Sequence, residues 1–215
     1  MDIGKAFNYP RNDPGWLTKL LILGLVSCVP ILNLAGFGFA LEAVRRVSRG
    51  EESTLPEWDN FGGYFMDGAR VLVTMLVYCI PIFLALGAVF GVAIATSSNG
   101  EPGPVFGLLM VLAQLFQIFW QFLIWAVTPA LMLRLAFDPG WGAGFDFGGM
   151  MGTVTRNVGS YVMVLLMTVA FGFVGALGAL ACFVGLLITL PYSQMAIAHL
   201  LGQLARETAE PASYS

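Results

Sequence analysis

Residues Trp16 to Leu41 read WLTKLLILGLVSCVPILNLAGFGFAL, and this first hydrophobic run decides how the rest of the chain meets a membrane. As one helix it would extend ~39 Å, enough to cross a hydrocarbon core of ~30 Å. Pro30 and Asn33 lie at its middle, however, and cations stand before and after it. The run is therefore either a single span or a re-entrant hairpin that turns near Pro30 and Asn33.

The composition is typical of a membrane protein. Hydrophobic residues make up 58% of the chain, charged residues only 11%, and the mean hydropathy is +0.80. An ordinary soluble domain carries about 25% charged residues. The net charge of −3 gives no basic excess, which argues against a nucleic-acid partner. The 3 cysteines fall inside hydrophobic runs, so we expect small buried apolar residues rather than a disulfide or a metal site.

The rest of the chain consists of hydrophobic runs separated by polar loops. The last run is too long for one crossing, and its recurring glycines at Gly172 to Gly178 indicate a turn between two spans. We predict an all-α integral membrane protein with four transmembrane helices, an N-terminal re-entrant or fifth spanning segment, and amphipathic interfacial helices. The single polytopic domain, 1–206, would comprise an interfacial segment at 1–15, the re-entrant or spanning segment at 16–41, a loop and interfacial helix at 42–70, and spans at about 71–96, 104–133, 157–175 and 178–201, followed by a polar tail at 207–215.

The positions of the cations indicate the orientation. The loop at 97–103 and the turn near 175 contain no Lys or Arg, so every cation after the first run lies on one side, which the positive-inside rule assigns to the cytoplasm. The C-terminus is therefore predicted to be cytoplasmic. A re-entrant first run keeps all 10 cations on that side, whereas a single span places three of them outside. One observation favours a single span instead. Residues 19–36 resemble residues 70–87 at an offset of 51, and residues 70–87 lie in a predicted span.

Few residues in the hydrophobic runs can carry chemistry. No Asp, Glu, Lys or Arg lies in residues 71–100, 102–133 or 157–205. Intramembrane charges mark ion coupling and membrane catalysis, so their absence predicts a protein that is not an enzyme. We also expect no cofactor.

Two polar features remain as candidates. Gln114, Gln117 and Gln121 fall on one helical face, which either lines a pore or ligand site or makes interhelical hydrogen bonds. His199 is the only histidine; it is either a hydrogen-bonded side chain or an axial ligand for a pigment or haem. Gly87 and Gly91 form a small-xxx-small pair that predicts close helix packing.

Several motifs resemble those of a known family. The chain opens with MDIGKAF and continues with DPGW at 13–16, PILN at 30–33, LPEW at 55–58 and AHLLGQL at 198–204. With these motifs it resembles, over nearly its whole length, the bacterial and archaeal multi-pass membrane proteins of the domain-of-unknown-function family 4013. It is also distantly similar to membrane domains attached to some glycerophosphodiesterases. The resemblance implies a helical protein of the prokaryotic cytoplasmic (inner) membrane and supplies no catalytic or binding residue.

The sequence therefore leads to three hypotheses about function. The first is a non-enzymatic membrane scaffold or accessory subunit that contacts lipids and packs against other membrane subunits or further copies of itself. The second is a passive small-molecule or lipid transporter that uses the glutamine face. The third is a pigment or haem carrier that uses His199.

Overall fold

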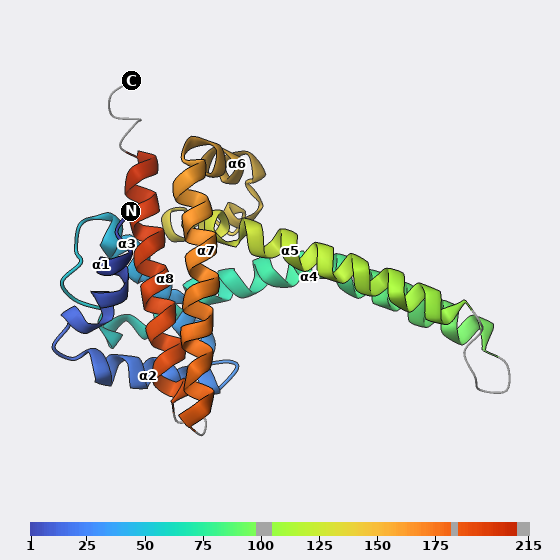
Figure 1. The fold of residues 1–215 in the computed structure, drawn as a ribbon, viewed down its shortest axis with the longest axis horizontal. Coiled ribbons are helices and arrows are strands. Elements are labelled where there is room, and N and C mark those ends of the chain that lie inside the picture. Colours follow the sequence, from blue (N-terminus) through green and yellow to red (C-terminus); the bar gives the residue numbers. More distant parts are fainter. Residues whose placement is uncertain (98–104, 182–184, 210–215) are drawn as a thin grey trace. The chain divides into compact units, whose positions relative to one another are not determined.

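The computed structural model describes residues 1–97, 105–181 and 185–209, and every regular element within these ranges is a helix (Figure 1). The all-α prediction is confirmed for them. The chain divides into two compact units: unit 1 contains Met1–Leu72 and Pro129–Ser215, and unit 2 contains Val73–Thr128. All 10 Lys and Arg residues belong to unit 1. The prediction that residues 1–206 form one domain stays a prediction.

Unit 1 is built around α8 (Leu186–Ala209), which is buried along most of its length. Protein rather than lipid surrounds this helix, so its polar side chains, including His199, can find partners. Four helices pack against it (Figure 1): α7 (Val158–Ala176), α1 (Ile3–Asn8), α2 (Trp16–Cys28) and α3 (Asn33–Ser48).

The first hydrophobic run forms two helices rather than one. Pro30 lacks the N–H needed to continue α2, and α3 begins at Asn33, whose N–H donates to Val29 O at 2.9 Å. The chain therefore turns at Pro30 and Asn33. The turn is apolar and uncovered, with Ile31 68% exposed. That the first hydrophobic run enters and leaves the membrane through the same face stays a prediction.

The two arms of this hairpin contact α8 at well-separated places along its length. Gly24 of α2 lies against the backbone of Leu187 in the first turn of α8, and Val47 of α3 lies against Gly202 near its other end. These two contacts are ~22 Å apart along α8 at ~1.5 Å per residue. The hairpin is therefore a principal layer of unit 1.

α3 crosses the beginning of α4 (Phe61–Thr96) at two close approaches, and a glycine makes each of them. A Cβ on Gly38 would collide with the backbone of Tyr64, and a Cβ on Gly68 would collide with the backbone of Leu34. Each glycine therefore allows the other helix to approach at backbone distance. Larger residues at either position would force the helices apart.

Residues 42–70, predicted to be a loop and an interfacial helix, contain the end of α3, a loop and the beginning of α4. α3 continues to Ser48, after which Gly50 adopts a φ of 91° and ends the helix. α4 then runs without a break from Phe61 to Thr96. No proline interrupts residues 61–70, so the aromatic segment and the following predicted span form a single helix.

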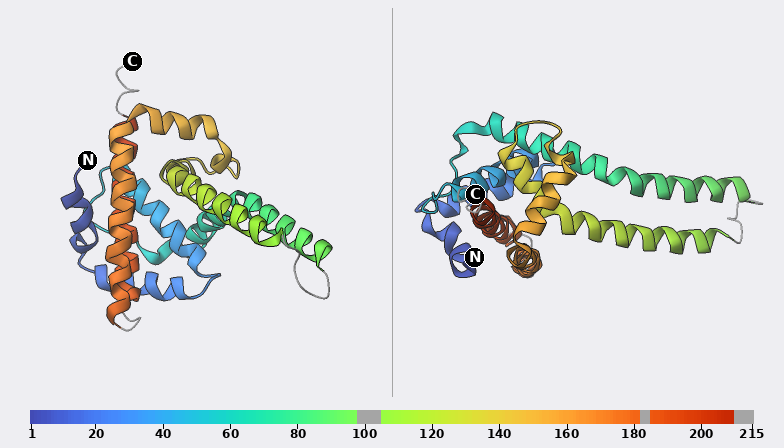
Figure 2. Two further views of the ribbon diagram at one scale, coloured as in Figure 1. Left: turned by 45° about the vertical axis from the view of Figure 1, so that its right-hand side comes forward. Right: turned by 90° about the horizontal axis from the view of Figure 1, so that it is seen from above.

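Unit 2 consists of the part of α4 after Leu72 and the part of α5 (Phe106–Phe137) before Pro129. The two segments lie side by side (Figure 1, Figure 2), and Trp120 Nε1–H donates to Tyr78 O at 2.8 Å. Pro81 lies inside α4, whereas Pro30, its counterpart at an offset of 51, lies between two helices. The two similar stretches therefore fold differently.

Between α5 and α7 the glycine-rich segment forms a short 3₁₀ turn and α6 (Phe147–Arg156). Asp146 caps α6 by accepting the N–H of Gly149 at 3.0 Å. α7 then runs to Ala176, so the turn expected at Gly172 to Gly178 begins only at the end of that range.

Within the described residues, three helical stretches are long and apolar enough to cross a membrane: Trp58–Thr96, Phe106–Phe137 and Val158–Leu180. They correspond to three of the four predicted spans. The fourth, 178–201, overlaps α8 and is not among them. A crossing by α8 stays a prediction.

Candidate functional site

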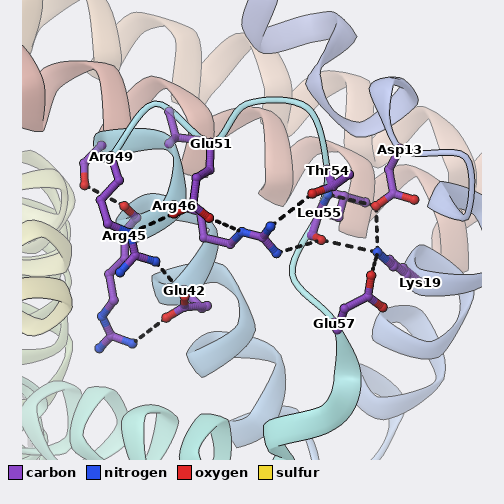
Figure 3. Close-up of polar contacts among 12 residues, drawn as sticks. Asp13, Lys19, Glu42, Arg45, Arg46, Arg49, Glu51, Thr54, Leu55 and Glu57 are labelled. Carbon is purple, nitrogen blue, oxygen red and sulfur yellow. Dashed lines mark hydrogen bonds and ion pairs between the residues drawn. The ribbon is translucent and has the colours of Figure 1, made fainter.

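A buried lysine joins the N-terminal segment to the loop after α3 (Figure 3). Lys19 Nζ donates to Asp13 Oδ2 and Glu57 Oε1, both at 2.6 Å, and to Leu55 O at 3.3 Å. Lys19 is 9% exposed and Asp13 is 2% exposed. Burial alone would raise the pKa of Asp13, but hydrogen bonds from Lys19 and from the N–H groups of Gly15 and Leu55 hold its pKa below the usual value. At neutral pH the contact is therefore a buried ion pair.

Arg46 of α3 fastens the same loop (Figure 3). Its guanidinium donates to Leu55 O at 3.1 Å, to Thr54 Oγ1 at 3.0 Å and to Glu51 Oε2 at 3.1 Å. Leu55 O thus accepts from both Arg46 and Lys19. The two cations hold the loop through one shared carbonyl.

A second cluster joins α3, α4 and the end of α5 within unit 1. Asp67 accepts from Arg45 at 2.6 Å and from Arg70 at 2.5 Å. The same arginines reach backbone carbonyls at the end of α5 and just after it: Arg45 donates to Ala136 O at 2.5 Å and Arg70 donates to Asp138 O at 2.7 Å. These contacts satisfy the carbonyls at the C-terminal end of α5.

Residues at opposite ends of the sequence also meet in unit 1. The α-amino group of Met1 lies 2.9 Å from Glu207 Oε1. Asp2 N–H donates to Gln203 Oε1 at 2.6 Å, and Gln203 Nε2 donates back to Asp2 O at 3.0 Å. The N-terminal residues are therefore bound to the last turns of α8.

His199 is enclosed by protein and is 1% exposed. Its Nδ1 lies 2.9 Å from Gln203 Nε2, its Nε2 lies 3.7 Å from Glu52 Oε2, and its ring centroid lies 4.9 Å from that of Tyr9. Both ring nitrogens face protein groups, which leaves neither turned toward a ligand. In the part of the chain that the structure describes, no group of three His, Cys, Asp or Glu side chains could hold a metal ion. The geometry gives the haem or pigment hypothesis no support.

The structure brings the three predicted glutamines together along one groove of unit 2. Gln114, Gln117 and Gln121 line it, together with Phe122 and Trp125, and the groove has a volume of about 420 Å³. The three amides make no hydrogen bond to any other described residue. Their polar groups are available to a partner outside the chain, and their role stays a prediction.

The small-residue prediction is not tested by contacts within the chain. Nothing lies within 4 Å of a Cβ placed on Gly87 or Gly91. Close approaches of a glycine to the backbone of another helix occur at Gly24, Gly38 and Gly68 instead. Cys28 is exposed, so the expectation that it is buried is wrong; Cys182 lies outside the described residues.

Sequence reasoning also missed a basic pocket in unit 1. Arg134 of α5, Arg156 of α6 and Arg206 of α8 line it, with the ends of α3 and α8 nearby. From the sequence, we used these arginines only to predict the orientation of the chain in the membrane. The glycines at the start of α6 were the available signal, because they leave one face of that helix without side chains.

Comparisons with known proteins give one match. A family model described as "Protein of unknown function (DUF4013)" matches residues 22–184, about three-quarters of the chain. No curated protein and no solved structure matches the chain significantly. The similarity to glycerophosphodiesterase-associated membrane domains is unconfirmed.

Proposed function

Because this chain belongs to a family of proteins of unknown function (DUF4013), we propose its role from its own geometry: a non-enzymatic membrane scaffold or accessory subunit. The exposed apolar surface of the long helices is the main support for this proposal. In the most apolar stretch of Trp58–Thr96, only 11% is buried inside the protein. In the most apolar stretch of Phe106–Phe137, only 6% is buried. Surfaces of this kind require lipid tails or other apolar helices around them.

The contacts between the two ends of the sequence support an even number of crossings. Met1 and Glu207 can form an ion pair only if they lie on the same side of the membrane. We propose that α4, α5, α7 and α8 cross and that the first hydrophobic run enters and leaves through one face. Both ends then lie in the cytoplasm, where the positive-inside rule places the arginines.

The glutamine groove supports self-association. Amide side chains without partners are unfavourable among lipid tails, and each amide both donates and accepts hydrogen bonds. The groove residues on a second copy of this chain therefore have complementary chemistry. We propose that two copies pair through Gln114, Gln117 and Gln121 in an isologous contact.

Energy transfer between donor-labelled and acceptor-labelled copies in liposomes tests this pairing. The double variant Gln117→Leu/Gln121→Leu is expected to associate about sevenfold more weakly, from two hydrogen bonds of about 0.6 kcal/mol each. The control, Leu115→Ala/Phe119→Ala, alters exposed α5 side chains that do not line the groove and should associate like the wild type.

Wild-type copies that show no more energy transfer than randomly mixed ones would refute self-association, as would a double variant that pairs normally.

The same unpaired amides favour a second candidate function, a passive transporter. In these liposomes it would appear as solute flux in the wild type that the double variant loses while the control keeps it.

A further inference from the structure

The basic pocket of unit 1 is a cavity of about 460 Å³, within the range of sites that hold small ligands. α3, α5, α6 and α8 all contribute to its wall. Three arginines line it, and none of the described residues in its lining is acidic. The lining therefore favours an anion.

Part of the hydrogen-bonding capacity of these arginines is unused. Arg134 pairs with Asp146 at 2.7 Å through one Nη, which leaves its other Nη. Arg156 is exposed and forms no ion pair with any described residue. Arg206 uses Nε and one Nη on Val47 O and Glu52, which leaves its other Nη. Donors from three helices are thus available around one cavity.

The glycines of α6 create the space in front of these donors. Gly148, Gly149 and Gly152 line the pocket, and a Cβ on Gly149 would collide with the guanidinium of Arg134. Nothing lies within 4 Å of a Cβ on Gly152, so that position borders open space. A helix with ordinary side chains here would fill the cavity.

The position of the pocket identifies the class of anion. It lies at the end of α5, a candidate span, and Phe137 forms an apolar part of its wall. Guanidinium groups match the geometry of phosphate oxygens, and basic pockets beside membrane helices are suited to phosphorylated headgroups. We propose that this pocket binds a phosphate group, carried either by an anionic phospholipid or by a free phosphate compound.

Binding to the purified full chain in detergent tests the proposal. The probes are short-chain phosphatidylglycerol, short-chain phosphatidylcholine and inorganic phosphate. The wild type should prefer phosphatidylglycerol to phosphatidylcholine.

Arg156→Gln should bind phosphatidylglycerol about tenfold more weakly than the wild type does, as expected for one lost charged hydrogen bond. Gly152→Leu should also weaken binding, because its side chain enters the cavity. The control, Lys5→Gln, removes an exposed cation of unit 1 that does not line the pocket.

The probes distinguish the two sources of phosphate. Binding of phosphatidylglycerol without inorganic phosphate assigns the site to a lipid, and binding of both assigns it to the phosphate group itself. The proposal is overturned if neither binds, or if Arg156→Gln and Gly152→Leu bind like the wild type. Arg156→Gln should keep normal energy transfer between copies, so failure here is separable from failure of self-association.

Discussion

Lys19→Met is expected to lower the free energy of unfolding by about 3–5 kcal/mol. The substitution keeps a long side chain but leaves Asp13 as a buried carboxylate without its cation. It also removes the contacts of Lys19 with Glu57 and Leu55, which join the N-terminal segment to the loop after α3. Denaturant titration of the purified protein in detergent measures the change.

Lys5→Met is the matched control, because Lys5 is exposed and forms no ion pair with any described residue. It should unfold at the same denaturant concentration as the wild type. If Lys19→Met also unfolds there, the buried ion pair does not stabilise unit 1 as described.

Gly68→Ala is expected to destabilise the protein by about 1–3 kcal/mol, although alanine favours a helix over glycine by about 1 kcal/mol. The added Cβ would overlap the backbone of Leu34, and neither backbone can move without separating α3 from α4. The thermal unfolding midpoint in detergent should fall accordingly.

Gly62→Ala provides the comparison within the same helix. Nothing lies within 4 Å of a Cβ at Gly62, so this variant should be as stable as the wild type or more stable. Equal midpoints for Gly68→Ala and Gly62→Ala would contradict the close crossing of α3 and α4.

Much of the helical framework follows from local sequence signals. Pro30 breaks the first run because it lacks an N–H, and this physical reason is visible in the sequence alone. The shared face of Gln114, Gln117 and Gln121 follows from helical periodicity in the same way.

The contacts that hold unit 1 together depend on residues far apart in the sequence. Lys19 and Glu57 are 38 residues apart, and Met1 and Glu207 are 206 apart, so no local pattern reveals either pair. The burial of α8 was missed for a related reason. Its apolar residues match both a lipid-facing span and a helix enclosed by protein, and only the packing of α1, α2, α3 and α7 distinguishes them.

We propose that the first hydrophobic run returns to its starting face, so that both ends of the described chain lie in the cytoplasm. It is tested most directly by labelling single cysteines from outside intact cells, with the three native cysteines replaced. Asn8→Cys, at the exposed last residue of α1, should label only after the cells are opened, whereas Ser97→Cys, exposed at the end of α4, should label in intact cells. Efficient labelling of Asn8→Cys in intact cells would contradict the account.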